Sequence, residues 1–205
     1  MNLLLKGDIM KSIPKEENGK IIFAKVDLSK MKKEIKTKKS FTREEYIDIL
    51  KVLRNQQTRV SYYYDSKDVG KKLSRTWIGY APDDKEMSNL IEATENTLQE
   101  LLDGLKTSEK FDSSESVQQK ISNSLIEFIN KQRTLNKSTD FLIEALDIFE
   151  NTIQTNKTLK DMNNDGKTAQ KIYTSFCKNV ESTNDSANNL SQEFSQAIDL
   201  GLPLA

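Results

Sequence analysis

The sequence predicts an all-α protein, an elongated antiparallel bundle of about four long helices with coiled-coil-like packing. The 205 residues include only seven glycines and three prolines, which is few for sheets joined by tight turns. Charged residues make up 30% and apolar residues 36%, a balance typical of slender amphipathic helices. Apolar residues recur at helical spacing over four stretches, about 42–64, 83–105, 113–160 and 167–199.

The longest stretch organises the rest of the chain. Residues 112–160 contain neither Gly nor Pro and open with Asp112 and Glu115, which are spaced as a capping box. Their apolar stripe steps alternately by four and three, as does a seam that packs along another helix. The stripe consists of Ile121, Leu125, Phe128, Gln132, Leu135, Thr139, Leu142, Leu146, Phe149 and Ile153.

Several residues depart from a simple seam. Gln132 and Thr139 are polar, and we interpret them as points where the bundle loosens or the face turns outward, the alternative being that they fix register. Phe141, Ile143 and Ile148 lie off the stripe and widen the apolar surface near residues 141–149. This width indicates contact with more than one helix.

The other helices are marked by their ends. Thr42 and Glu45 form a second capping box before the stretch 42–64, and Asp83 and Glu86 form a third. The Asn- and Asp-rich residues 161–166, which end in Gly166, are predicted to be the turn between the last two helices.

Residues 1–40 lack the long helical pattern of the rest of the chain and are predicted to form an extended basic arm. Residues 20–28 are rich in β-branched side chains and indicate a short β segment, with 76–80 as a candidate partner strand. The alternative is that this segment simply lies across the helices. The arm ends in a basic run of Lys30, Lys32, Lys33, Lys36, Lys38 and Lys39.

The basic run leaves two interpretations open. Such a run can bind phosphate groups of nucleic acid or an anionic membrane, or it can be a solvated linker or helix face. It has no interleaved aromatic residues to stack on bases, which argues against nucleic acid. Net charge is zero, but residues 1–80 hold 19 basic and 10 acidic side chains, and residues 81–205 hold 12 and 21. This polarity either orients association between molecules or is chance unevenness of solvated faces.

The composition argues against histidine-dependent catalysis, transition-metal sites and intramolecular disulfides. The chain has no histidine, the commonest general base and transition-metal ligand, and its single cysteine, Cys177, cannot form an intramolecular disulfide. Cys177 follows Phe176 on an apolar face and is predicted to be a small buried hydrophobe. No glycine-rich phosphate loop occurs. We therefore expect no enzymatic activity, no cofactor and no small-molecule substrate.

One metal motif is half complete. Asp161, Asn163, Asp165 and Gly166 match the first half of a calcium loop, D-x-N-x-D-G. The twelfth position is Ile172, where a bidentate Glu is needed. A turn between two helices explains the same residues, and no metal site is expected.

Trp77 and Gly79 stand between two predicted helices as Trp-Ile-Gly. This resembles the WXG family of small helical hairpins, which are substrates and partners of the bacterial type VII secretion route. The resemblance implies that the Trp and Gly occupy the turn of a hairpin and that the protein is exported. The chain is about twice the family's usual length, and it lacks the tyrosine-acid export signal after the second helix.

The sequence thus favours a non-enzymatic helical protein that binds a partner protein or itself through amphipathic helix faces. A secreted substrate or effector of the WXG type, and a nucleic-acid or membrane binder using the lysine run, are the alternatives. The run Met1–Lys6 is too short for a signal-peptide core, and no run approaches the ~20 apolar residues of a membrane span. We expect a cytoplasmic protein, with signal-independent secretion left open. The predicted partner-binding residues are Phe128, Leu135, Leu142, Phe149, Tyr62, Tyr63 and Trp77.

Overall fold

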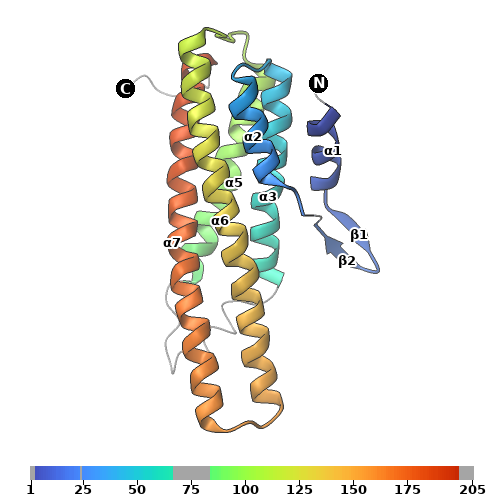
Figure 1. Cartoon of the computed structure of the whole chain (residues 1–205), viewed down its shortest axis with the longest axis vertical. Helices are drawn as coiled ribbons and strands as arrows, with labels where there is room; N and C mark the ends of the chain where they lie inside the picture. The colour runs from blue at the N-terminus through green and yellow to red at the C-terminus, as the bar shows by residue number, and fades with distance from the viewer. Residues whose placement is uncertain (1–2, 24, 67–83, 199–205) are drawn as a thin grey trace.

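The computed structural model describes residues 3–23, 25–66 and 84–198. This part of the chain is mostly helical, at 83%, with six helices and a small two-stranded sheet. The long helices are α3 (Arg43–Ser66), α5 (Asp84–Thr107), α6 (Glu115–Gln154) and α7 (Leu159–Ala197). They alternate in direction along the long axis of a helical bundle (Figure 1).

The two longest helices extend beyond the others. α6 has 40 residues and spans about 60 Å at 1.5 Å per residue. In Figure 1, α6 and α7 continue side by side past the lower ends of α3 and α5 and form a two-helix hairpin. The described helices therefore surround α6 along its first half more completely than along its second half.

The seam of α6 is buried along most of its length. Every residue of the predicted stripe from Ile121 to Phe149 is at most 5% exposed, and only Ile153 lies in solvent. The interpretation that Gln132 and Thr139 face outward was wrong, because they are 0% and 2% exposed. The Thr139 hydroxyl donates to the Leu135 carbonyl at 2.8 Å, and Gln132 Nε2 donates to Asn136 Oδ1 at 3.0 Å.

The predicted extended arm is instead folded. It contains α1 (Leu3–Ser12), a hairpin of β1 (Lys15–Glu17) and β2 (Lys20–Ile22), and α2 (Leu28–Lys38). Of the predicted β segment 20–28, only Lys20–Ile22 form a strand, which pairs with β1. The candidate partner strand, 76–80, lies outside the described residues. Asn18 and Gly19 both have positive φ, at 53° and 72°, as a two-residue hairpin turn requires.

Helix α2 forms for the usual amphipathic reasons. Leu28, Met31 and Ile35 are spaced by three and four and are at most 3% exposed, and α2 packs on α6. The Asp27 carboxylate accepts a hydrogen bond from the Lys30 N–H at 3.2 Å and caps the helix. The basic run is therefore a helix face and not a linker.

Two helix boundaries differ from the predicted ones. α6 ends at Gln154 rather than 160, and α7 begins at Leu159 rather than 167. Asn156 adopts a left-handed conformation, with φ of 51°, and turns the chain between them. Thr158 caps α7 by accepting from the Asp161 N–H at 3.2 Å. The predicted turn at 161–166 is therefore part of α7.

The predicted capping boxes have different outcomes. At α3 the box is confirmed, because the Thr42 N–H donates to Glu45 Oε2 at 2.9 Å and the Glu45 N–H donates to Thr42 Oγ1 at 3.2 Å. At α6 the N-cap is Ser114, and Asp112 instead accepts from the Ser114 N–H at 2.9 Å. Asp83 of the third box lies outside the described residues.

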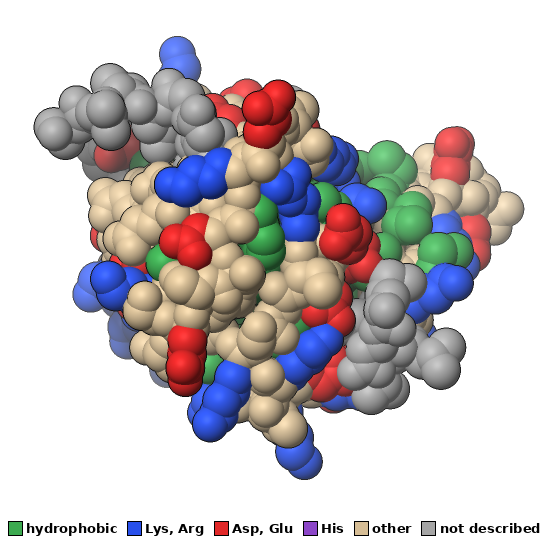
Figure 2. Space-filling view, turned by 90° about the horizontal axis from the view of Figure 1, so that it is seen from above, with side chains coloured by type: hydrophobic (Ala, Val, Ile, Leu, Met, Phe, Trp, Pro, Cys, Tyr) green, Lys and Arg blue, Asp and Glu red, His purple; other side chains and the backbone are tan. Residues whose placement is uncertain are grey.

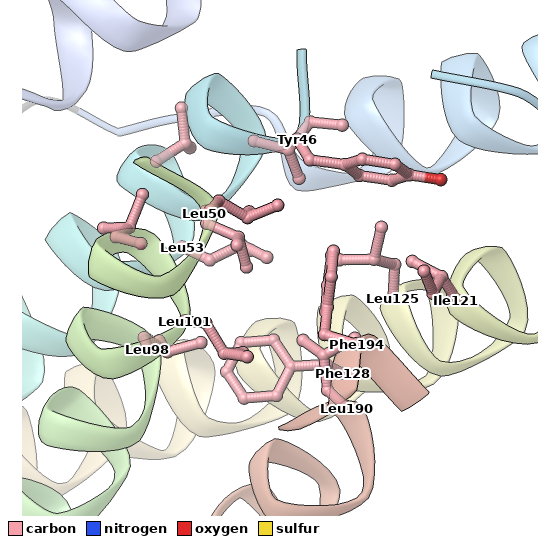
Figure 3. Close-up of a cluster of buried hydrophobic side chains, with 14 of the residues drawn as sticks. Tyr46, Leu50, Leu53, Leu98, Leu101, Ile121, Leu125, Phe128, Leu190 and Phe194 are labelled. Carbon is pink, nitrogen blue, oxygen red and sulfur yellow. The ribbon is translucent and has the colours of Figure 1, made fainter. Parts of the chain in front are cut away.

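The core consists of two apolar clusters. The upper cluster joins α2, α3, α5, α6 and α7. Figure 3 shows side chains from α3, α5, α6 and α7 converging in it. It includes Tyr46, Leu50, Leu101, Leu125, Phe128, Leu190 and Phe194. Tyr46 is fully buried and its hydroxyl donates to Gln118 Oε1; burial, aided by Glu45, raises the pKa of this phenol. The lower cluster includes Val60, Tyr64, Ile91, Leu135, Leu142, Tyr173 and Phe176.

A layer of buried polar side chains separates the two clusters. On each long helix, the layer falls between the last residue of one cluster and the first residue of the other. Its members are at most 3% exposed: Gln56, Gln57, Thr94, Gln132, Thr183 and Ser186. Hydrogen bonds tie the layer together; for example, Gln57 Nε2 donates to the Ile91 carbonyl at 3.2 Å, and Asn184 Nδ2 donates to Thr94 Oγ1 at 3.0 Å.

Candidate functional site

The predicted seam residues do not form a surface. Phe128, Leu135, Leu142 and Phe149 are between 0% and 5% exposed, because the other helices of the same chain cover them. In this structure a partner cannot reach these four side chains without opening the bundle. The candidate interaction surfaces are instead the apolar residues that the described helices leave uncovered.

The predicted aromatic site is partly assembled. Tyr62 and Tyr63 are half-buried, and the Phe23 ring lies 5.5 Å from the Tyr62 ring and 6.1 Å from the Tyr63 ring. The Arg59 guanidinium lies over the Tyr63 ring at 5.0 Å. The two tyrosines thus hold Phe23, the residue that follows β2, against α3. Trp77 and Gly79, which carry the resemblance to the WXG family, lie outside the described residues.

An exposed apolar strip runs along the second half of α6. Phe141 is 58% exposed and Ile148 is 50% exposed, and their seven-residue spacing puts them on the same helix face. Both are among the off-stripe residues from which the sequence indicates an additional helix contact. Within the described residues, no such helix covers them. We call this surface the α6 strip.

Two hollows flank the α6 strip. One has a volume of about 550 Å³ and lies toward α3, with Tyr63, Asp140, Ile143 and Asp147 among its lining residues. The other, of about 160 Å³, lies toward α7 and is lined by Phe141 and Ile172 among others. Glu144 and Ile148 border both hollows and form the ridge between them.

The polar edge of the α6 strip is acidic. Asp140, Glu144 and Asp147 line the larger hollow, and the only basic residue among its lining residues is Arg59. Arg59 is already paired, because its Nη2 lies 2.6 Å from Asp140 Oδ1. The strip therefore offers apolar contact beside negative charge.

A second exposed apolar group lies on the N-terminal segment. Met10, Ile13, Ile21 and Ile22 are between 42% and 61% exposed. In Figure 2, which looks along the bundle from above, hydrophobic side chains gather on the side where α1 and the hairpin lie in Figure 1. Acidic and basic side chains are mixed over the rest of that view.

The lysine run is a solvent-facing surface of α2 and of the residue that follows it. Lys30, Lys33, Lys36 and Lys39 are exposed and Lys32 is half-buried. Lys38 is paired with Glu45. Burial raises the pKa of the Glu45 carboxyl, but the hydrogen bonds from Lys38 and from the Thr42 N–H outweigh burial, and the net pKa is lowered. Lys38 thus supports the capping box at the start of α3 through Glu45.

The half calcium motif lies within α7 and is not arranged as a calcium-binding loop. Asp161, Asn163 and Asp165 lie in the first turns of α7, where side chains two residues apart point in divergent directions. Asp161 accepts from the Thr158 hydroxyl at 2.8 Å, and Asp165 accepts from the Thr152 hydroxyl at 2.6 Å. Among the described residues, no group of three or more acidic or sulfur ligands is placed to hold a metal ion.

Cys177 is half-buried against the lower cluster. Burial raises the pKa of its thiol to about 11, so that almost none of it is thiolate at neutral pH. The side chain packs as a small hydrophobe and is a poor nucleophile.

Comparisons with protein-family models, with curated proteins and with solved structures gave no match. None of the described helices is both long and apolar enough to cross a membrane. The geometry of the chain itself is therefore the basis for a functional proposal.

Proposed function

We propose that this chain is a non-enzymatic interaction protein that binds a helix of a partner protein on the α6 strip. The observation that carries the proposal is the exposure of Phe141 and Ile148, at 58% and 50%, on one face of α6. Large exposed apolar side chains with a polar border are typical of protein-binding surfaces. The seven-residue spacing suits the i, i+3, i+4 and i+7 anchors of a helix that lies in a groove.

The chemistry of the strip defines the partner. Glu144 and Asp147 favour basic side chains on the incoming helix, whereas Phe141 and Ile148 favour apolar ones. We therefore expect an amphipathic helix whose polar face is rich in Lys or Arg. A second copy of the chain is the other occupant to test, because the exposed residues Met10, Ile13, Ile21 and Ile22 lie beside several lysines.

We also propose that α3, α5, α6 and α7 act as one four-helix unit in which the α6 seam packs as in a coiled coil. The burial of the alternating three- and four-spaced residues supports this packing. A unit stabilised by its own seam leaves the α6 strip available for other molecules.

The test uses a fluorescent amphipathic peptide of leucine and lysine, with binding followed by anisotropy. The double variant F141A/I148A is compared with Leu159→Ala, which removes another exposed aliphatic side chain, 72% exposed, that lines neither hollow. We expect the double variant to bind at least about tenfold more weakly, as for hot-spot residues, and the control to match the native chain. Equal binding by all three proteins refutes the proposal.

Light scattering coupled to size-exclusion chromatography distinguishes the two occupants. A monomer at low and at high salt supports a different protein as the partner. A dimer or larger species that F141A/I148A dissociates supports a second copy. An oligomer that this variant leaves intact uses another surface and contradicts self-association through the strip.

The second candidate function is the binding of nucleic acid or an anionic membrane by α2. It is favoured by the burial of Leu28, Met31 and Ile35, since this burial turns most of the lysine run to solvent. Binding should weaken steeply with salt and when Lys32, Lys33, Lys38 and Lys39 are changed to Gln. Binding that does not respond to salt removes this candidate. The secreted WXG-type alternative stays a prediction, tested by export of Trp77→Ala from a bacterial host.

A further inference from the structure

A small pocket lined by charged side chains lies where the start of α2 meets α3 and α6. Its volume is about 250 Å³, below the ~300–1,000 Å³ of sites for drug-sized ligands. Four basic side chains line it, Lys25, Arg59, Arg133 and Lys137, against two acidic ones, Asp27 and Asp140. The pocket therefore has the size of a small ligand and an excess of positive charge.

The two acidic groups are already engaged by neighbours. Asp27 accepts from the Lys30 N–H at 3.2 Å as the cap of α2, and Asp140 accepts from Arg59 at 2.6 Å. Among the described residues, neither Lys25, Arg133 nor Lys137 makes an ion pair. The lining thus keeps a net positive charge, although Asp27, whose hydrogen-bond partner is a neutral N–H, still carries its negative charge.

The wall of the pocket is connected to the buried polar layer. Gln132 Nε2 donates to Asn136 Oδ1 at 3.0 Å, and Asn136 Nδ2 donates to Gln56 Oε1 at 2.9 Å. Gln56 lines the pocket and is only 3% exposed. Its Nε2 has no hydrogen-bond partner among the described residues. The Nε2 donor of this largely buried side chain is therefore left for a ligand in the pocket.

We propose that this pocket binds a phosphate group. Phosphate oxygens accept charge-assisted hydrogen bonds from Arg and Lys, and the Gln56 amide adds a neutral donor. α2 has 11 residues and begins at the pocket, so the positive end of its dipole adds to the attraction. The volume fits a free phosphate or a simple phosphate monoester, and also the head of a phospholipid. The site depends neither on the α6 strip nor on the solvent-facing lysines of α2.

The binding test uses the whole chain and two soluble probes, inorganic phosphate and glycerol 3-phosphate, in isothermal titration calorimetry. The double variant R133Q/K137Q is compared with K120Q/K131Q, which removes two charges from the same helix at residues that do not line the pocket. Circular dichroism confirms that both variants are folded. Sedimentation with phosphatidylcholine vesicles, with and without phosphatidic acid, tests the lipid source.

We expect one phosphate per chain and at least about a tenfold loss of affinity in R133Q/K137Q, with K120Q/K131Q unchanged. Titration by the soluble probes supports a free phosphate compound. Sedimentation with phosphatidic acid vesicles that R133Q/K137Q abolishes supports a lipid headgroup. The proposal is overturned if neither probe nor vesicle binds, or if the two double variants lose affinity equally.

Discussion

Phe128→Ala and Phe141→Ala are a matched pair that tests which phenylalanines of α6 belong to the core and which to the surface. The same substitution is made twice on one helix, once at a fully buried ring and once at a ring that is 58% exposed. Phe→Ala in a packed core costs about 3–5 kcal/mol. At Phe141 less than half of the ring is buried, so the loss of burial costs about 0.6–1.2 kcal/mol. The better helix propensity of Ala offsets about 0.5 kcal/mol of this.

The assay is urea unfolding followed by far-ultraviolet circular dichroism. We expect Phe128→Ala to lower the free energy of unfolding by about 3–5 kcal/mol and Phe141→Ala by less than about 1 kcal/mol. Both variants should keep the native urea dependence, so that the difference reports stability alone. Equal losses at the two positions would refute the assignment of Phe128 to the core and of Phe141 to a surface available to partners.

Three further predictions concern ionisable groups. Glu45→Gln should cost about 1 kcal/mol at pH 7 by weakening the cap of α3; because the pKa of Glu45 is lowered from 4.5, the native chain should lose this stabilisation as the pH falls below that value, and the variant should not. The Glu34 carboxylate oxygens are buried without a hydrogen-bond partner among the described residues. Burial raises the pKa of this group, Lys30 opposes the rise and Asp8 adds to it. Glu34→Gln should therefore raise the melting temperature at pH 7. The native chain should lose stability as the pH rises above 4.5, and the variant should not. A lower melting temperature in the variant would contradict this account. Cys177 should react with a thiol reagent at pH 8 about a hundredfold more slowly than free cysteine, since its pKa is about 11, and rapid labelling of the folded chain would show that the thiol is not buried.

The long helices could be predicted because one strong signal defines them. Apolar residues recur with the helical period, and α3 and α5 begin and end within two residues of the predicted ranges. The boundary between α6 and α7 was harder, since Asn163, Asp165 and Gly166 look like a turn. The actual turn depends on Asn156 in a left-handed conformation and on the Thr158 cap, both of which are common residues with local roles.

The N-terminal segment held signals that the lysine run obscured. Leu28, Met31 and Ile35 have helical spacing, but the charged residues between them suggest a linker. Asn18-Gly19 is a strong hairpin signal, and it pairs the strands on either side of it. Local turn chemistry predicts this hairpin better than the search for a distant strand.

The candidate sites could be predicted only in part. Phe141 and Ile148 stand out in the sequence as apolar residues off the seam, but their exposure depends on where α3 ends and α5 begins. The phosphate pocket could not be found from spacing, because Lys25, Gln56 and Arg133 come from segments far apart in the chain. Only the folded structure brings these side chains together.

The buried polar layer is connected to the proposed phosphate pocket through Asn136 and Gln56, which line it. Three buried polar atoms of the layer, Gln57 Oε1, Gln132 Oε1 and Ser186 Oγ, have no hydrogen-bond partner among the described residues. Each such atom costs about 1–3 kcal/mol relative to an apolar replacement of the same shape. Natural chains break local rules of this kind mainly where a function requires it. Because Gln132 and Asn136 orient the Gln56 amide, the layer that weakens the core also supplies the buried donor of the proposed phosphate site.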